Sequence, residues 1–279
     1  MKDEIWSLGV KFERKIAGLV KFLSCLSSLL LASSSFAQPP QQSAPALKKP
    51  LIYQIGQIVH VNAGGPRPLL QAIDALQQKY GWVVDYEDPQ YPAAMAGATN
   101  QPSPPGRRHA NIAETSENAF SVQFNVGPTP DSRPDEATVL TTVIDAYNQS
   151  GGAAEFKLLR EHDAGFAVVG IGVRDLNNEI ASQQPVLDML ISLASESRSA
   201  GETITLICRK VSQGSKVPIS VNPTENLHEN ARVAVGGSSV EARSLLSRAL
   251  LSMGEKLYWR LIYDADGKNY VLSIQSPSR

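Results

Sequence analysis

The sequence is poor in the side chains that hold metals or form disulfides, with two cysteines and four histidines among 279 residues. The histidines stand at 60, 109, 162 and 228, so no two of them have the i, i+3 or i+4 spacing of a local metal motif. The cysteines, at 25 and 208, are too few for a disulfide framework. We therefore expect no metal and no other cofactor.

An excess of charge is also missing. The 26 lysines and arginines nearly balance the 27 aspartates and glutamates, for a formal net charge of −1. Without a basic excess there is no general attraction to phosphate backbones, so we expect no nucleic-acid partner. The hydrophobic content of 42% and charged content of 19% are typical of a soluble globular protein and exclude a chain disordered throughout.

Familiar catalytic motifs are absent as well. A serine-hydrolase elbow needs the pattern G-x-S-x-G, but neither Ser215 nor Ser238 has the second glycine. The segment Gly170-Ile171-Gly172 follows an expected strand without the third glycine of a dinucleotide-binding loop, so we interpret it as strand packing or a bulge. We expect a protein that is not an enzyme.

The first 37 residues have the order of a secretory signal peptide. A basic stretch precedes a leucine-rich run at 22–32, and small residues ending in Ser35-Phe36-Ala37 predict cleavage before Gln38. The run is shorter than the roughly 20 apolar residues that span a bilayer, so retention as a membrane anchor is the less favoured alternative. We expect a periplasmic or secreted protein without stable membrane insertion, whose residues 38–50 form a disordered tether.

From residue 51 onward, apolar residues alternate between the period of strands and the period of helices. In the first half, strands are predicted at 55–61, 82–86 and 120–126, helices at 68–80 and 139–147, and a hairpin at 155–160 and 166–173. The second half repeats this order, with strands at 189–193, 218–221 and 232–235, two helices, and a hairpin at 257–263 and 270–274. The fold class is therefore α+β, with two small β-α-β-β-α-β-β modules at 51–175 and 185–276, each with two helices packed on short mixed sheets.

The two helices of the second half start with the spacing of a capping box. Ser199 stands three residues before Glu202, and Ser238 three before Glu241. Cys208 lies on the apolar stripe of the first of these helices, so we expect a buried thiol without a catalytic role.

Two segments of the first half contain charged residues that could bind something. Asp85, Glu87 and Asp88 at the end of an expected strand could hold a cation, although we expect solvated carboxylates. The insertion 88–118 contains five prolines and no apolar period, so we expect a mobile loop rather than a packed one. Arg107 and Arg108 within it are candidate contacts for an anionic partner; a solvated loop is the alternative.

Residues 68–76 (PLLQAIDAL), followed by 80–86 (YGWVVDY), resemble the short N-terminal (STN) domain shared by secretins and TonB-dependent transducers. The stretch 199–221, a helix that returns through Pro218-Ile219-Ser220-Val221, looks like the same unit again. In that family the module precedes a channel or a β-barrel, and we expect none after the last strand of this chain. The resemblance therefore implies only a capacity to dock envelope proteins, including components of secretin or TonB-dependent systems.

These patterns favour an exported, non-enzymatic adaptor that engages another envelope protein through its sheet edges and its insertion by strand addition. The alternative is a periplasmic protein that binds a small ligand or a glycan, with Trp82, Tyr86 and Tyr91 lining a cleft between the domains. If Trp82 and Tyr86 point inward, they belong to the core instead.

Overall fold

The computed structural model describes residues 51–92, 119–127, 133–161, 165–175, 179–222 and 231–277. Within these residues it contains four α-helices and fourteen strands, so the predicted α+β class is confirmed. The signal sequence, the tether and positions 93–118, with Arg107 and Arg108, lie outside the described residues.

The elements of the two halves follow one another along the chain with one short 3-10 turn between them. The first half contains β1 (Ile52–Ile55), β2 (Ile58–Ala63), α1 (Pro68–Tyr80), β3 (Val84–Glu87), β4 (Phe120–Asn125), α2 (Glu136–Gln149), β5 (Ala154–Glu161), β6 (Gly165–Arg174) and β7 (Ile180–Ser182). After η3 (Val186–Asp188), the second half contains β8 (Leu190–Leu193), β9 (Arg198–Ser199), α3 (Ala200–Ser215), β10 (Ile219–Val221), β11 (Arg232–Val233), β12 (Gly237–Glu241), α4 (Ala242–Leu251), β13 (Tyr258–Asp264) and β14 (Asn269–Gln275).

The same strand pairing occurs in both halves. In the first, β2 pairs antiparallel with β4, β3 pairs parallel with β6, and β6 pairs antiparallel with β5. In the second, β8 pairs antiparallel with β12, β10 pairs parallel with β14, and β14 pairs antiparallel with β13. The duplicated module is thus visible in the sheet topology, and the two halves are called repeats below.

One strand contact joins the repeats into a larger sheet. Strand β13 pairs in parallel with β3, with Arg260 opposite Tyr86 and Leu261 opposite Glu87. The sheet therefore runs in the order β10-β14-β13-β3-β6-β5, with β7 on β6. The described residues all belong to one compact unit. That each half folds by itself stays a prediction, but their sheets are continuous.

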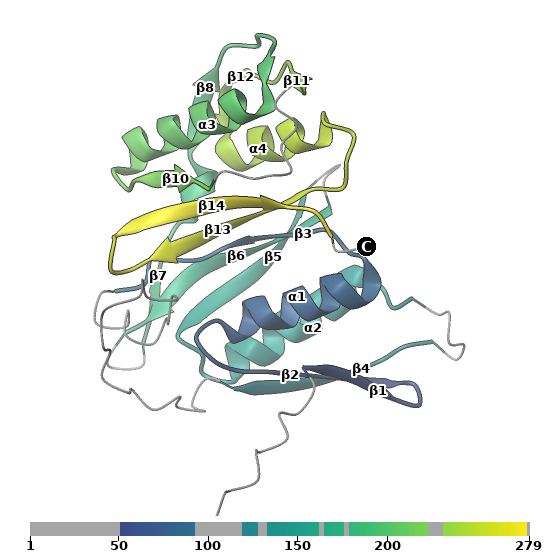
Figure 1. Cartoon of the computed structure of the whole chain (residues 1–279). Coiled ribbons are helices and arrows are strands. Elements are labelled where there is room, and N and C mark those ends of the chain that lie inside the picture. Colours follow the sequence, from purple (N-terminus) through teal and green to yellow (C-terminus); the bar gives the residue numbers. More distant parts are fainter. Residues whose placement is uncertain are drawn as a thin grey trace, which may run out of the picture. The chain divides into compact units, whose positions relative to one another are not determined.

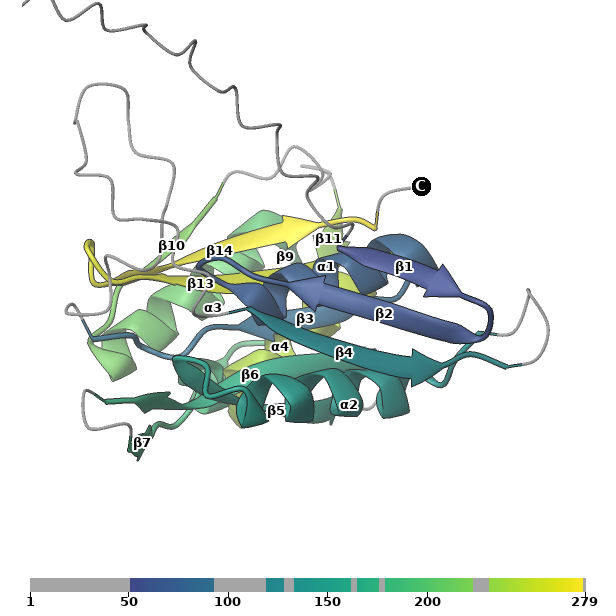
Figure 2. The same cartoon turned by 90° about the horizontal axis from the view of Figure 1, so that it is seen from below.

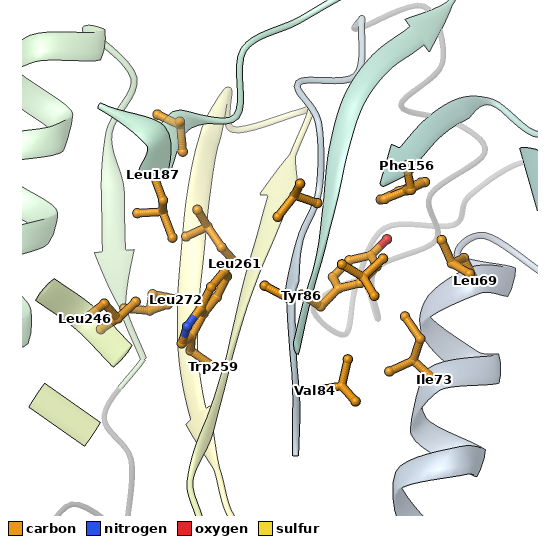
Figure 3. Close-up of a cluster of buried hydrophobic side chains, with 14 of the residues drawn as sticks. Leu69, Ile73, Val84, Tyr86, Phe156, Leu187, Leu246, Trp259, Leu261 and Leu272 are labelled. Carbon is orange, nitrogen blue, oxygen red and sulfur yellow. The ribbon is translucent and has the colours of Figure 1, made fainter. Parts of the chain in front are cut away.

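The helices of the two repeats cover opposite sides of this joint (Figure 1). Helices α3 and α4 lie above β13 and β14 in that view, and α1 and α2 lie below, between the joint sheet and the sheet β1-β2-β4. Figure 2 shows β1, β2 and β4 as the outer layer on that side. In the core, Val84 and Tyr86 lie toward Leu69 and Ile73 of α1, whereas Trp259 lies on the side of α4 (Figure 3).

Local signals explain where the two equivalent helices begin and end. Helix α1 begins with a proline in its first turn and ends at Gly81, whose φ of 69° is easy only for glycine. Helix α3 begins with the predicted capping box of Ser199 and Glu202, and its C-cap is Lys216, also left-handed with a φ of 61°. Cys208 is buried as expected.

Two local predictions are wrong, and a third is confirmed. The single strand expected at 55–61 is a hairpin of β1 and β2, because Gly56 adopts a φ of 59° and turns the chain. Ser238 does not cap α4; it lies inside β12, and the helix begins after Glu241 without a side-chain cap. The Gly170 segment is a bulge, since a Cβ on Gly170 would lie 2.4 Å from Pro89 and the register of β5 and β6 shifts there.

Candidate functional site

Two aspartates at the edge of β3 hold the incoming strand β13. Asp85 Oδ1 accepts a hydrogen bond from the main-chain N–H of Trp259 at 2.8 Å, and Asp88 Oδ2 accepts one from that of Tyr263 at 3.1 Å. Between these contacts, the main-chain N–H of Asp88 donates to the Leu261 carbonyl at 2.9 Å. Carboxylates thus extend a short strand ladder by one hydrogen bond at each end.

The incoming strand also places a charged side chain against helix α1. Arg260 donates from Nη1 to Asp74 Oδ2 at 2.9 Å and from Nη2 to Gln77 Oε1 at 3.3 Å. The guanidinium carbon lies 5.0 Å from the centre of the Tyr258 ring. Strand β3 therefore contacts the backbone of β13, and helix α1 binds one of its side chains.

The solvent exposure expected for Asp85, Glu87 and Asp88 is wrong. Their exposed fractions are 3%, 0% and 1%, because β13 converts β3 from an edge strand into an inner strand. Asp88 forms an ion pair with Arg67 Nε at 2.8 Å and accepts a hydrogen bond from the Tyr86 hydroxyl at 2.9 Å. Among the described residues, no group of three histidine, cysteine, aspartate or glutamate side chains is placed to hold a metal ion.

On the other face of β3, one arginine meets three carboxylates. Arg243, at the start of α4, has Nη2 3.0 Å from Glu87 Oε2 and Nε 3.9 Å from Glu161 Oε1, and it also pairs with Asp188. The hydroxyl of Ser247 donates a hydrogen bond to Glu161. We call Arg243, Glu87, Asp188 and Glu161 the arginine cluster. It ties α4 of the second repeat to β3 and β5 of the first.

The acids in and beside this cluster keep their protons to higher pH than they would in water. Burial raises the pKa of Glu87 to about 7, against the attraction of Arg243. Burial also raises the pKa of Asp85 well above its ordinary value, with a further contribution from Glu161, whose own pKa is raised by burial. The charge of the junction between the repeats therefore changes near neutral pH.

The junction is closed to large ligands. A pocket of about 260 Å³ reaches Asp85 and Ser247 between β3 and the end of α4. Apart from the ion pairs of the arginine cluster, several buried polar atoms make no hydrogen bond to another described residue: Arg243 Nε and Nη1, Glu87 Oε2, Glu161 Oε1 and Trp259 Nε1. Such atoms cost stability, so the repeats are held together by the ion pairs of the cluster and by the pairing of β3 with β13.

A larger groove, of about 580 Å³, lies in the second repeat between α3 and β10. It is lined by Thr205, Cys208, Arg209, Ser212, Gln213, Lys216, Pro218, Ile219 and Val221. Within the part of the chain that the structure describes, β10 is the last strand of the sheet on this side. The groove therefore runs along a sheet edge that no described strand covers, and we call it the α3/β10 groove.

The hydrogen bonds of β10 show which of its main-chain groups face the groove. The N–H of Tyr270 donates to the Pro218 carbonyl and the N–H of Asn222 to the Leu272 carbonyl, each at 2.8 Å. Because main-chain groups of successive residues point to opposite sides of a strand, those of Ile219 and Val221 face away from β14. The N–H of Ile219 donates to Ser212 Oγ of α3 at 2.8 Å. Val221 thus presents a donor and an acceptor to the groove.

The charged side chains among the described residues that line this groove are both positive. They are Arg209 and Lys216, which are exposed and form no ion pair with any described residue. A neighbouring pocket of about 480 Å³ shares Arg209 and adds Arg198 and Glu202. The Glu202 carboxylate there is engaged in the capping box with Ser199.

The aromatic residues singled out from the sequence lie in the hydrophobic core. Trp82, Tyr86 and Tyr91 have exposed fractions of 7%, 1% and 7%. Tyr86 stacks on Phe156 with ring centres 5.6 Å apart, and Trp82 stacks on Tyr80 at 4.8 Å. The inward orientation named above as the core alternative is therefore the observed one, and it leaves these rings little surface for a partner.

Sequence reasoning missed the features that make β3 and α1 of the first repeat comparable to β10 and α3 of the second. It did not single out Arg209, Arg260 or Arg243. One signal was available: carboxylates at Asp85 and Glu87, on a strand whose neighbouring positions are apolar, indicate buried acids that need partners. The partner strand itself has no local signal, since β13 lies more than 170 residues further along the chain.

None of the described helices combines the length and apolarity needed to cross a membrane. No protein-family model matches the chain, and neither the curated proteins nor the solved structures contain a match to it.

Proposed function

We propose that the chain is an exported, non-enzymatic envelope adaptor, built from two modules of the secretin/TonB short N-terminal type, that binds another envelope protein by strand addition at β10. The observation that carries this proposal is the open edge of β10 beside the α3/β10 groove. The counterpart edge in the first repeat, on β3, already accepts a strand, β13.

The α3/β10 groove has the two parts that strand addition uses. Main-chain groups of an edge strand supply affinity, and a groove beside the edge takes alternate side chains of the added segment. Val221 supplies the main-chain donor and acceptor, and α3 forms the far wall of the groove. Free edges are usually protected by charges, prolines or a short strand. The three-residue β10 (Ile219–Val221) contains no charge and no proline, and because Ser212 takes the Ile219 N–H, Val221 is its position open to an added strand.

The experiment is a substitution that alters only the open side of β10. Val221→Pro removes the N–H that faces the groove. It leaves in place the two hydrogen bonds to β14 that the Pro218 carbonyl accepts and the Asn222 N–H donates. Val221→Thr is the matched control, because it keeps the N–H and the branched side chain. Affinity capture from envelope extract, with identification by mass spectrometry, should recover the same protein with the wild type and Val221→Thr. Equal capture of that protein by a folded Val221→Pro variant would refute strand addition at β10.

A second candidate function, binding of a neutral glycan, is supported by the outer face of the sheet β1-β2-β4. Tyr53 and His60 stack there across the strands with ring centres 4.7 Å apart. The other side chains of this face are uncharged: Ile55, Ile58, Asn62, Ser121, Gln123 and Asn125. Rings surrounded by amide and hydroxyl groups suit a polyhydroxyl ligand.

This candidate is tested by affinity electrophoresis in gels containing dextran or pullulan. Tyr53→Ala combined with His60→Ala should abolish retardation of the chain by the polysaccharide, whereas Val221→Pro should leave it unchanged. If neither gel retards the wild type, neutral glucans are not ligands of this face.

A further inference from the structure

The two repeats can be aligned through the left-handed residue that ends each first helix. Gly81 and Lys216 both occupy this C-cap position, and each stands three residues before the first residue of the following strand. The alignment superposes four buried residues of α1 on four buried residues of α3: Leu69, Ala72, Ile73 and Leu76 on Ile204, Ile207, Cys208 and Val211. Tyr86 of β3 then corresponds to Val221 of β10.

In the first repeat β13 lies beside Tyr86, so the structure shows which residue an added strand places at this position. Arg260 of β13 stands opposite Tyr86 in a parallel pairing. Its guanidinium bonds to Asp74 and Gln77, seven and four residues before the C-cap of α1. The helix beside the edge therefore selects a side chain of opposite charge on the added strand.

In the second repeat the same position on the helix carries the opposite charge. Seven and four residues before Lys216 stand Arg209 and Ser212, and both line the α3/β10 groove. Lys216 adds a second positive charge at the end of the groove near Pro218. An acidic side chain opposite Val221 would meet Arg209 as Arg260 meets Asp74.

We infer that the α3/β10 groove binds an extended acidic segment of a partner protein, which adds in parallel to β10 and places a carboxylate opposite Val221 and against Arg209. This inference rests on the proposed function, strand addition at β10, and names the chemistry of the segment that adds.

The free edge of a second copy of this chain is a poorer occupant. The strand of the first repeat that corresponds to β13 is β5, and its open edge is protected at Phe156, whose main-chain N–H and carbonyl both bond to the Asn148 side chain. Lys157 of β5 stands at the place of Arg260 in the equivalent pairing, so a second copy would bring a positive charge toward Arg209. Both features disfavour continuation of the sheet from chain to chain.

The test uses the full chain and three short fluorescein-labelled peptides in which valine alternates with aspartate, asparagine or lysine. Binding is measured by fluorescence anisotropy at low and high salt. The aspartate peptide should bind about tenfold more tightly than the asparagine peptide at low salt, from two exposed charge contacts, and the lysine peptide should bind most weakly. High salt should remove most of the preference for the aspartate peptide over the asparagine peptide.

Variants separate the contribution of the charge contacts from that of main-chain pairing with β10. Arg209→Glu combined with Lys216→Glu should reverse the preference toward the lysine peptide while the asparagine peptide binds as before. Val221→Pro should weaken binding of all three peptides. Lys79→Glu, a change at another exposed lysine on α1, is the control and should leave the preference unchanged.

Each contrary outcome has a distinct meaning. Equal binding of the aspartate and asparagine peptides, lost in Val221→Pro, would overturn the acidic segment and leave strand addition standing. Undiminished binding of the aspartate peptide by a folded Val221→Pro variant, or no binding of any peptide, would overturn both proposals. Self-association in analytical ultracentrifugation that Val221→Pro abolishes would make a second copy the occupant and overturn the acidic partner.

Discussion

Asp85 of the first repeat accepts a hydrogen bond from the main-chain N–H of Trp259 in the second, at 2.8 Å, and both residues are buried. A side chain thus takes the place of a main-chain carbonyl in a strand ladder. Because the buried Trp259 N–H cannot form a hydrogen bond to water instead, the joint between the repeats depends on the Asp85 carboxylate keeping its position.

Asp85→Ala should destabilise the chain, because the Trp259 N–H would be buried without an acceptor. A cost of about 1–3 kcal/mol in the free energy of unfolding is expected, measured by urea denaturation. Asp85→Asn is the control, since it keeps an acceptor oxygen of similar shape and should cost less. Equal stability of the alanine variant and the wild type would show that the hydrogen bond contributes nothing to the joint.

The pH dependence of stability should carry the signature of Glu87. Its pKa is higher in the folded chain, about 7, than its ordinary value of 4.5, so folding is accompanied by proton uptake between these values. The stability that this group contributes is complete below 4.5 and is lost as the pH rises through about 7. Urea denaturation at a series of pH values should show this fall in the wild type and a shallower one in Glu87→Gln.

The exposed Glu196, which pairs with Arg198 at the surface, supplies the control for this experiment. Glu196→Gln should have the pH profile of the wild type. A Glu87→Gln profile that coincides with it would contradict the assignment of the slope to the arginine cluster.

The sequence predicts the elements of this fold better than it predicts their assembly. The spacing in α1, the capping box of α3 and both hairpins are local patterns, and they are present as expected. The parallel contact of β3 with β13 is not local, and no spacing within β3 specifies its partner. For this reason the carboxylates of Asp85 and Glu87 were expected in solvent, although the sheet buries them.

The candidate site was less predictable than the fold because its chemistry depends on comparing two distant segments. Arg209 is an ordinary surface residue by its own neighbours in the sequence. Its significance follows from Asp74 at the same distance from the C-cap of the other helix and from the partner of Asp74, Arg260. Only the paired strands show that these positions correspond.

Cys208 should react slowly with thiol reagents in the native chain. It is 2% exposed, and burial raises the pKa of its thiol to about 12, so little thiolate is present at pH 8. Labelling with iodoacetamide, followed by mass spectrometry, should accelerate in denaturant. Gln213→Cys in a Cys208→Ser background, on the exposed side of α3, should react rapidly as the control. Fast native labelling of Cys208 would contradict the burial of this face.

The fragment 185–279 should unfold cooperatively but at a lower temperature than the full chain, because it lacks the β3 edge that pairs with β13. Trp259 is its sole tryptophan and is fully buried in the full chain. Its fluorescence should therefore shift to the red in the fragment and return when the fragment 51–175 is added. An unfolded fragment would show that the second module does not fold independently.

Two deletions in the proline-rich insertion should have different effects. Gln90 belongs to the folded part, since its N–H donates to Gln183 Oε1 at 2.9 Å and its carbonyl accepts from Gln183 Nε2 at 3.0 Å. Tyr91 is buried. Removal of 90–113 should therefore lower the thermal midpoint, whereas removal of 93–113 spares these contacts and should cost little, because closure entropy depends weakly on loop length.

Differential scanning calorimetry of both deletions measures this difference, and peptide anisotropy on the same samples adds a second readout. The described residues that line the α3/β10 groove all belong to the other repeat. Binding of the aspartate peptide should therefore survive the shorter deletion unchanged. If that deletion abolishes binding while the thermal midpoint stays at the wild-type value, the insertion contributes to the partner surface, and β10 alone does not define it.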